Sequence, residues 1–134
     1  MKKIIIWIIS GILFIKSLFI LTYEKVDSYT NYTEVEIDNN PFDFNTISNN
    51  DSLTHIFKIK NITNTLLVIE KVLPSCPCTT VSFNKNKCLK DEVVSVKAKF
   101  KPSKIQKGVV KTVIFVQCNA EKGIVKLELI GKIK

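Results

Sequence analysis

The sequence predicts an all-β fold, an antiparallel sandwich of about seven short strands that follows one apolar N-terminal segment. From residue 41 onward, apolar and polar residues alternate in short runs, and no stretch has the period of a helix. Turn-forming residues separate these runs at intervals of about 8–12 residues, which is typical of β-sandwiches. The 94 residues from 41 to 134 are enough for one domain with a thin core.

The first 23 residues predict a signal anchor, a single transmembrane helix that is not removed. Lys2 and Lys3 precede the segment Ile4–Leu21, in which 14 of 18 residues are apolar. A helix of this length spans about 27 Å, enough to cross a bilayer core. Because no small-residue cleavage pattern follows, we expect an anchor in the cell membrane through residues 4–22 rather than a cleaved signal peptide. The N-terminal positive charge places residues 24–134 outside the cytoplasm, on the periplasmic side.

Residues 24–40 are predicted to form a polar stalk, with the sandwich domain at 41–134. Val35 and Ile37 alternate with acidic residues and could begin an edge strand. Two triplets, Asn31-Tyr32-Thr33 and Asn61-Ile62-Thr63, match the glycosylation acceptor pattern, which short sequences often match by chance.

All 20 basic residues are lysine, and residues 24–134 hold 17 Lys against 12 Asp plus Glu, a net charge of +5. This net positive charge suits binding to nucleic acid or to anionic lipid. Phosphate and base recognition, however, relies on the bidentate fork of arginine, which is absent here. We therefore expect a solvated lysine surface that protects sheet edges, and no nucleic-acid partner.

Strands are expected at residues 42–47, 53–60, 65–73, 79–83, 94–100, 110–118 and 125–130. The predicted inward-facing sets are Leu53, His55, Phe57 and Ile59; Val94, Val96, Ala98 and Phe100; Ile114, Val116 and Cys118; and Val125, Leu127 and Leu129. Glu70-Lys71 interrupts the third strand and predicts a bulge. Short strands with this spacing indicate an immunoglobulin-like sandwich.

Residues 41–134 also resemble a bacterial domain family of unknown function with an immunoglobulin-like fold, related to the hydin-like, ASH-type domains. The resemblance rests on Phe42 and Phe44; His55, Phe57, Ile59 and Asn61; Leu67 and Ile69; Ser75, Cys76, Cys78 and Thr79 of a Ser-Cys-Gly-Cys-Thr signature; and Gly131. This chain departs from the family at Asn45 and Pro77, where the family has Gly, and in lacking a Pro-Gly turn near Cys88 to Asp91. Asn tolerates positive φ and Pro does not. The resemblance implies an exported or periplasmic protein and supplies no enzymatic activity.

The disulfide candidates are Cys76, Cys78, Cys88 and Cys118, because an exported chain with four cysteines suggests disulfides. Three full pairings exist, and the sequence does not choose among them. A Cys76–Cys78 bond would close a small, readily reduced ring suited to redox chemistry. Pairing each of these cysteines with Cys88 or Cys118 would instead give long structural cross-links, worth about 3–4 kcal/mol each. Free thiols are a third alternative.

A metal site has three weak candidate ligands, Cys76, Cys78 and His55, which suit copper(I) or zinc. A closed zinc site needs a second spaced pair, and Cys88 and Cys118 do not form one. His55 belongs to an inward-facing set, where a packed and hydrogen-bonded histidine is the simpler interpretation. We therefore expect neither metal nor cofactor.

Catalysis has little support, since no nucleophile elbow, Gly-rich phosphate loop, HExxH motif or second histidine is present. A dyad of His55 with Cys76 or Cys78 has no favourable spacing. We expect that the protein is not an enzyme and has no catalytic residue and no small-molecule substrate.

The leading hypothesis is that the protein is a membrane-anchored structural or interaction module that binds another envelope protein through sheet edges and end loops. The alternative is metal or redox handling by Cys76 and Cys78. A third hypothesis, that the protein is a pilus-type chaperone, rests on fold analogy alone.

Overall fold

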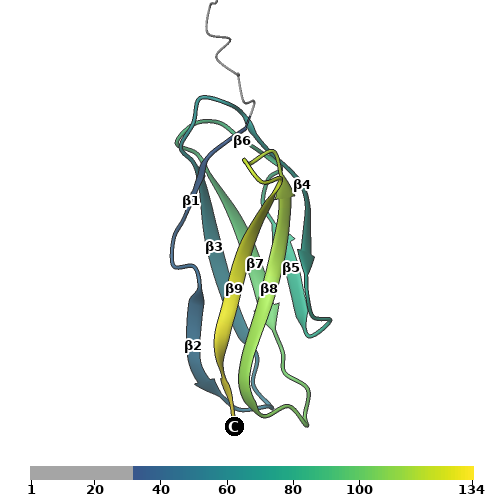
Figure 1. The fold of residues 1–134 in the computed structure, drawn as a ribbon. Coiled ribbons are helices and arrows are strands. Elements are labelled where there is room, and N and C mark those ends of the chain that lie inside the picture. The colour runs from purple at the N-terminus through teal and green to yellow at the C-terminus, as the bar shows by residue number, and fades with distance from the viewer. Residues whose placement is uncertain (1–31) are drawn as a thin grey trace, which may run out of the picture. The chain divides into compact units, whose positions relative to one another are not determined.

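The computed structural model describes residues 32–134, which form nine strands in two packed sheets (Figure 1). The strands are β1 (Val35–Ile37), β2 (Phe42–Ile47), β3 (Leu53–Asn61), β4 (Leu67–Pro74), β5 (Thr79–Phe83), β6 (Lys87–Cys88), β7 (Val93–Phe100), β8 (Gly108–Cys118) and β9 (Ile124–Ile133). The predicted all-β sandwich is confirmed. The helix expected at residues 1–23, and residues 24–31 of the expected stalk, lie outside the described residues. Between residues 32 and 134 there is no helix of sufficient length and apolarity to cross a membrane.

One sheet has the order β1-β3-β7-β5, and the other has the order β2-β9-β8-β4-β6. Neighbouring strands are antiparallel except β2 and β9, which run parallel, so the expectation of a wholly antiparallel sandwich is wrong at that edge. The chain passes from β1 in one sheet to β2 in the other without reversing direction (Figure 1). The Asn40 side chain attaches the start of β2 to β9: it donates to the Lys126 carbonyl at 2.9 Å and accepts from the Glu128 amide at 2.9 Å.

The folded domain begins before residue 41, the expected boundary, because β1 pairs with β3. The edge strand expected at Val35 and Ile37 is therefore present, and residues 35–37 are not part of a stalk. Thr33 is fully buried, and its amide donates to the carbonyl of Asn119 at 3.0 Å. The loop expected at residues 84–90 contains β6, which pairs with the start of β4.

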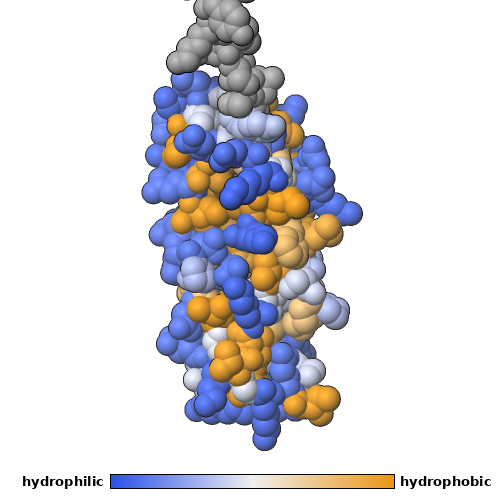
Figure 2. All heavy atoms as spheres, viewed as in Figure 1, coloured by the Kyte–Doolittle hydropathy of each residue, from blue (hydrophilic) through white to orange (hydrophobic). Residues whose placement is uncertain are grey.

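The core lies between the two sheets and consists of the side chains that the alternation predicted to face inward. All members of the predicted inward sets in β7, β8 and β9 are buried, and Phe57 and Ile59 of β3 are buried as well. Leu53 and His55, at the start of β3, are only partly buried. The predicted bulge in β4 is confirmed by a register shift between Ile69 and Lys71. On the outer surface, hydrophobic and hydrophilic residues are intermixed over the face shown in Figure 2.

The ring of Phe44 lies against the backbone of Gly131, and the local conformation of β2 puts it there. Asn45 has a φ of 58°, the left-handed conformation expected where the related family has Gly. The register between β2 and β9 shifts between Asp43 and Thr46 at this residue. A Cβ added to Gly131 would overlap the Phe44 ring, so glycine is required there by close approach rather than by an unusual φ.

At the end of the sandwich where β3 and β8 finish, the buried amide of Asn61 joins two loops. Its Nδ2 donates to the Thr65 carbonyl at 2.8 Å and to the Cys88 carbonyl at 3.0 Å. Its Oδ1 accepts from the amide and the hydroxyl of Thr63 at 3.0 and 2.9 Å. All four hydrogen-bonding positions of the side chain are thus used. Because Asn61 is fully buried, the triplet Asn61-Ile62-Thr63 is not an accessible glycosylation acceptor in the folded protein.

Candidate functional site

The Cys76-Pro77-Cys78 loop connects β4, in one sheet, to β5, in the other. The two Sγ atoms lie within bonding distance, and the Cα atoms are 5.1 Å apart. The loop closes when the Thr79 amide donates to the Cys76 carbonyl at 3.1 Å. The Cys78 carbonyl accepts from the Lys101 amide at 2.9 Å, which ties the loop to the end of β7. Both cysteines are partly exposed, so the pair is held rigidly at the surface.

Cys88 and Cys118 are buried and have no disulfide partner. They flank β4, opposite Leu67 and Ile69 respectively, so one strand separates them. Across two strand spacings, about 9–10 Å, a disulfide cannot form. The Cys76 loop is at the opposite end of β4, so the long cross-links that were one alternative for the cysteines are not formed in this structure. Burial raises the pKa of the Cys118 thiol, which keeps it protonated and unreactive at neutral pH.

A hollow of about 360 Å³ lies beside Cys78 and is lined by Pro77, Cys78, Thr80, Lys99 and Lys101. Lys99 lies opposite Thr80 in the β5–β7 register, and Lys101 follows the end of β7. Two lysine side chains therefore line the same hollow as the partly exposed Cys78. The alternation in β7 put these lysines on the outer face, but only the β5–β7 pairing brings them to the cysteines.

His55 lies between aromatic rings and not beside the cysteines. Its ring stacks on Phe42 with centroids 3.7 Å apart, and it meets Phe57 edge-on at 4.6 Å. The expectation of a hydrogen-bonded histidine is wrong for Nε2, which is buried and has no partner within the described part of the chain. Phe42, whose ring stacks on that of His55, comes from the other sheet. Two strand spacings separate His55 from β5, so no ligand set with Cys76 and Cys78 is assembled.

Burial lowers the pKa of His55 below its usual value of 6.5, and the Asp38 carboxylate partly offsets that effect. The unfolded chain then binds the proton more tightly than the folded one, so stability decreases as the pH falls through about 6.5. We expect the urea midpoint to decrease between pH 7 and pH 5. His55→Phe should remove this dependence, since His55 is the only histidine. An unchanged slope in His55→Phe would contradict the assignment.

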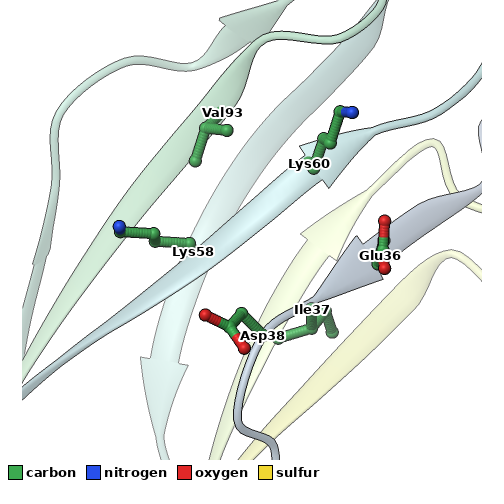
Figure 3. Close-up of a pocket in the computed structure, with 6 residues that line it drawn as sticks. All are labelled: Glu36, Ile37, Asp38, Lys58, Lys60 and Val93. Carbon is green, nitrogen blue, oxygen red and sulfur yellow. The ribbon is translucent and has the colours of Figure 1, made fainter.

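A second hollow, of about 330 Å³, lies on the outer side of β1, β3 and β7. Figure 3 shows Glu36, Ile37 and Asp38 on one side of it and Val93 on the other, with Lys58 and Lys60 of β3 between them. Lys60 forms an ion pair with Asp91, with 3.0 Å between Nζ and Oδ1. This mixture of charges favours no single class of ligand. In residues 32–134, no three His, Cys, Asp or Glu side chains come together to hold a metal ion.

A family profile described as "Protein of unknown function (DUF1573)" matches residues 35–133 of the chain. No curated protein matches it.

Solved structures share the fold. A protein of unknown function from Porphyromonas gingivalis W83 superposes with a TM-score of 0.65 at 10% identity, covering 82% of this chain and 51% of that one. The ASH / PapD-like domain of human CEP192 (PapD-like domain 7) superposes with a TM-score of 0.57 at 16% identity, covering 78% of this chain and 87% of that one. The VesB protease of Vibrio cholerae superposes with a TM-score of 0.58 at 12% identity, covering 75% of this chain and 31% of that one. The chain spans about half the length of the Porphyromonas protein. These likenesses show an immunoglobulin-like, PapD-like sandwich and nothing of its activity.

Proposed function

The chain belongs to the family described as Protein of unknown function (DUF1573), and we propose that it is an interaction module of the cell envelope. The sandwich is exported and held at the membrane by residues 4–22, with the domain on the periplasmic side. It is not an enzyme, and it acts by presenting a sheet edge to another envelope protein.

The observation that carries this proposal is the composition of β5. Of the four edge strands in the described sheets, β1 contains Glu36, β2 contains Asp43 and β6 contains Lys87, whereas β5 reads Thr-Thr-Val-Ser-Phe. Charged residues on edge strands prevent pairing with other chains, and β5 has none. An extended segment of a partner can add to such an edge through backbone hydrogen bonds.

The neighbouring strand indicates the charge of that partner. Lys97 and Lys99 of β7 are exposed, lie opposite Ser82 and Thr80, and flank the β5 edge on the outer face. Lys101 extends this row toward the Cys76 loop. The partner segment is therefore expected to be acidic, since complementary charge steers association and disfavours basic competitors.

Crosslinking from the β5 edge tests the proposed function. A photo-crosslinking residue at Ser82 should yield a discrete adduct with an envelope protein in cells, whereas the same residue at Lys126, on the outer face of central strand β9, should not. Phe83→Lys, at a side chain that is 39% exposed, should abolish the adduct, because it places a charge on the edge. Val109→Lys, at an exposed residue of β8 in the other sheet, is the matched control. Equal adducts from Ser82 and Lys126, or no adduct from Ser82, would overturn the proposal.

A second candidate function is thiol–disulfide exchange, which the hollow beside Cys78 favours. We propose that Cys76 and Cys78 form a disulfide in the exported protein and that Lys99 and Lys101 attract an anionic thiol. The incoming thiolate bonds to one cysteine sulfur and releases the other as a thiolate. A second thiol then attacks the sulfur of the first thiol in this mixed disulfide and releases the protein cysteine, so two thiols become one disulfide while the protein pair is reduced to two thiols.

Thiol counting and exchange rates test this second function. In the native chain no thiol should react with an alkylating reagent; after mild reduction two should react, and after reduction and unfolding all four. The Lys99→Gln, Lys101→Gln double variant should slow exchange with glutathione, which is anionic, several-fold at low salt. Exchange with mercaptoethanol, whose thiolate carries less negative charge than that of glutathione, should be slowed less. Equal slowing of both reagents would exclude an electrostatic role for the lysines, and four reactive thiols in the native chain would exclude the disulfide.

A further inference from the structure

Several exposed apolar side chains gather at the end of the sandwich where β3 and β8 finish, which we call the upper end, as it lies at the top of Figure 1. Its exposed apolar residues are Tyr32 (51% exposed), Ile62 (41%), Leu66 (37%), Leu89 (63%) and Ile124 (49%). They come from four separate parts of the chain: the residues before β1, the β3–β4 loop, the β6–β7 loop and the start of β9. Single exposed apolar residues are ordinary, but convergence of several segments marks a contact surface.

Hydrogen bonds hold these segments in fixed positions relative to one another. The Ile62 amide donates to the Glu34 carbonyl at 3.2 Å. Asn119 Nδ2 donates to the Leu66 carbonyl at 2.9 Å, while Asn61 joins the β3–β4 loop to Cys88. The upper end is therefore a preformed surface, which loses little conformational entropy when it binds.

The charges at the upper end permit contact with a lipid headgroup layer. Two of its acidic residues are already paired, Asp91 with Lys60 at 3.0 Å and Glu92 with Lys85 at 2.9 Å. Three exposed lysines, Lys87, Lys90 and Lys122, have no ion pair within residues 32–134, against the exposed acids Glu34 and Glu121. The small positive excess means that apolar contact, more than charge, would provide the binding.

The position of the apolar segment in the sequence identifies the partner. Tyr32 is the first described residue. It precedes Thr33, whose amide donates a hydrogen bond to the Asn119 carbonyl at the upper end. Only residues 23–31 separate Tyr32 from the apolar segment at residues 4–22. Nine residues reach at most about 30 Å, so the upper end is confined close to any membrane that holds the apolar segment. At an effective concentration on the order of millimolar, even weak contacts are populated.

We propose that the upper end of the sandwich rests on the outer surface of the membrane that holds residues 4–22, with Ile62, Leu66, Leu89 and Ile124 inserted among the lipid headgroups. This inference rests on the membrane anchoring put forward above. The contact fixes the orientation of the domain: the opposite end, with the β7–β8 loop and the carboxyl terminus, points away from the membrane (Figure 1). The β5 edge then stands along the membrane normal and stays open to a partner.

Tryptophan fluorescence tests the proposal in the full chain, reconstituted in phosphatidylcholine vesicles whose acyl chains are brominated close to the headgroup. Trp7 is the only tryptophan and lies in the apolar segment, so its quenching reports insertion of that segment. In a Trp7→Phe background, Leu89→Trp should show blue-shifted emission and lose most of its intensity in brominated vesicles. Ile105→Trp, at an opposite-end residue that is 91% exposed, should remain unquenched. Ile124→Trp is a second reporter at the upper end, should Leu89→Trp fold poorly.

The outcomes separate the two proposals. Quenching of Trp7 with no quenching at positions 89 and 124 would overturn the membrane contact and leave the anchoring intact. Absence of quenching of Trp7 would overturn the anchoring and the contact together. Blue-shifted but unquenched emission at position 89 that depends on protein concentration would assign the upper end to a second copy of the chain, and so would also overturn the proposal.

Discussion

Replacing Gly131 with alanine is expected to lower the free energy of unfolding by about 2–3 kcal/mol, as overpacking of a core contact does. The added Cβ would overlap the Phe44 ring, which is 7% exposed and packs on Phe100 with ring centroids 5.7 Å apart. Either the ring leaves the core or β2 separates from β9. The gain from a less flexible unfolded chain, about 0.4–1 kcal/mol, offsets only part of this cost. Urea unfolding of the variant measures the difference.

A double-mutant cycle shows whether the Phe44 ring is the cause. In a Phe44→Ala background the space is already empty, so Gly131→Ala should cost less than about 0.5 kcal/mol, the usual effect of a substitution away from the core. Lys132→Ala, at the exposed neighbouring position, controls for changes in strand propensity. An equal cost of Gly131→Ala in both backgrounds would show that the contact with Phe44 is not responsible.

Replacing Asn61 with alanine is expected to cost about 3 kcal/mol, because polar groups of three other residues, buried at Cys88 and partly buried at Thr63 and Thr65, lose a partner. The carbonyls of Thr65 and Cys88 lose their donor, and the amide of Thr63 loses its acceptor. Each unpaired buried group costs about 1–3 kcal/mol. Thermal or urea unfolding of the variant measures the loss.

Asn61→Asp separates hydrogen bonding from side-chain volume. Aspartate has nearly the same shape and keeps the acceptors for Thr63, but it cannot supply the two N–H donors. Its charge would be buried, so the variant should become less stable as the pH rises through the carboxyl pKa and the group ionises. Asn84→Ala, at an exposed asparagine that accepts from the Ser95 amide at 2.9 Å, is the matched control and should cost far less. Equal losses for Asn61→Ala and Asn84→Ala would mean that burial of the Asn61 amide is unimportant.

Some features of the fold were predictable because they depend on one residue and its backbone. The left-handed φ of Asn45 is such a case, since only Gly, Asn and a few others adopt it at low cost. A second left-handed residue, Asp91 with φ 63°, lies where the related family has a Pro-Gly turn, and the sequence did not single it out. Asp shares the tolerance of Asn, so its place in the polar loop before β7 was the available signal.

The pairing of the cysteines and the surroundings of His55 were not predictable from the sequence. Cys88 and Cys118 are both inward-facing, yet they lie on opposite sides of β4, so their separation depends on strand order. His55 was expected to find a hydrogen bond, but Phe42 from the other sheet covers its ring. Sequence spacing does not contain either fact, because both come from elements that meet only in the folded domain.

The sequence by itself determined most of the strands, though not β6, and which face of each of those strands enters the core, because side chains alternate strictly along an extended backbone. It also determined the lysine-rich outer surface and the apolar segment at residues 4–22. Only the tertiary structure decided that β2 runs parallel to β9, that β5 is an open and uncharged edge, and that Lys99 and Lys101 flank Cys78. These features depend on which strands become neighbours, and strand order is set by packing of the two sheets, about which the local alternation of apolar residues contains no information.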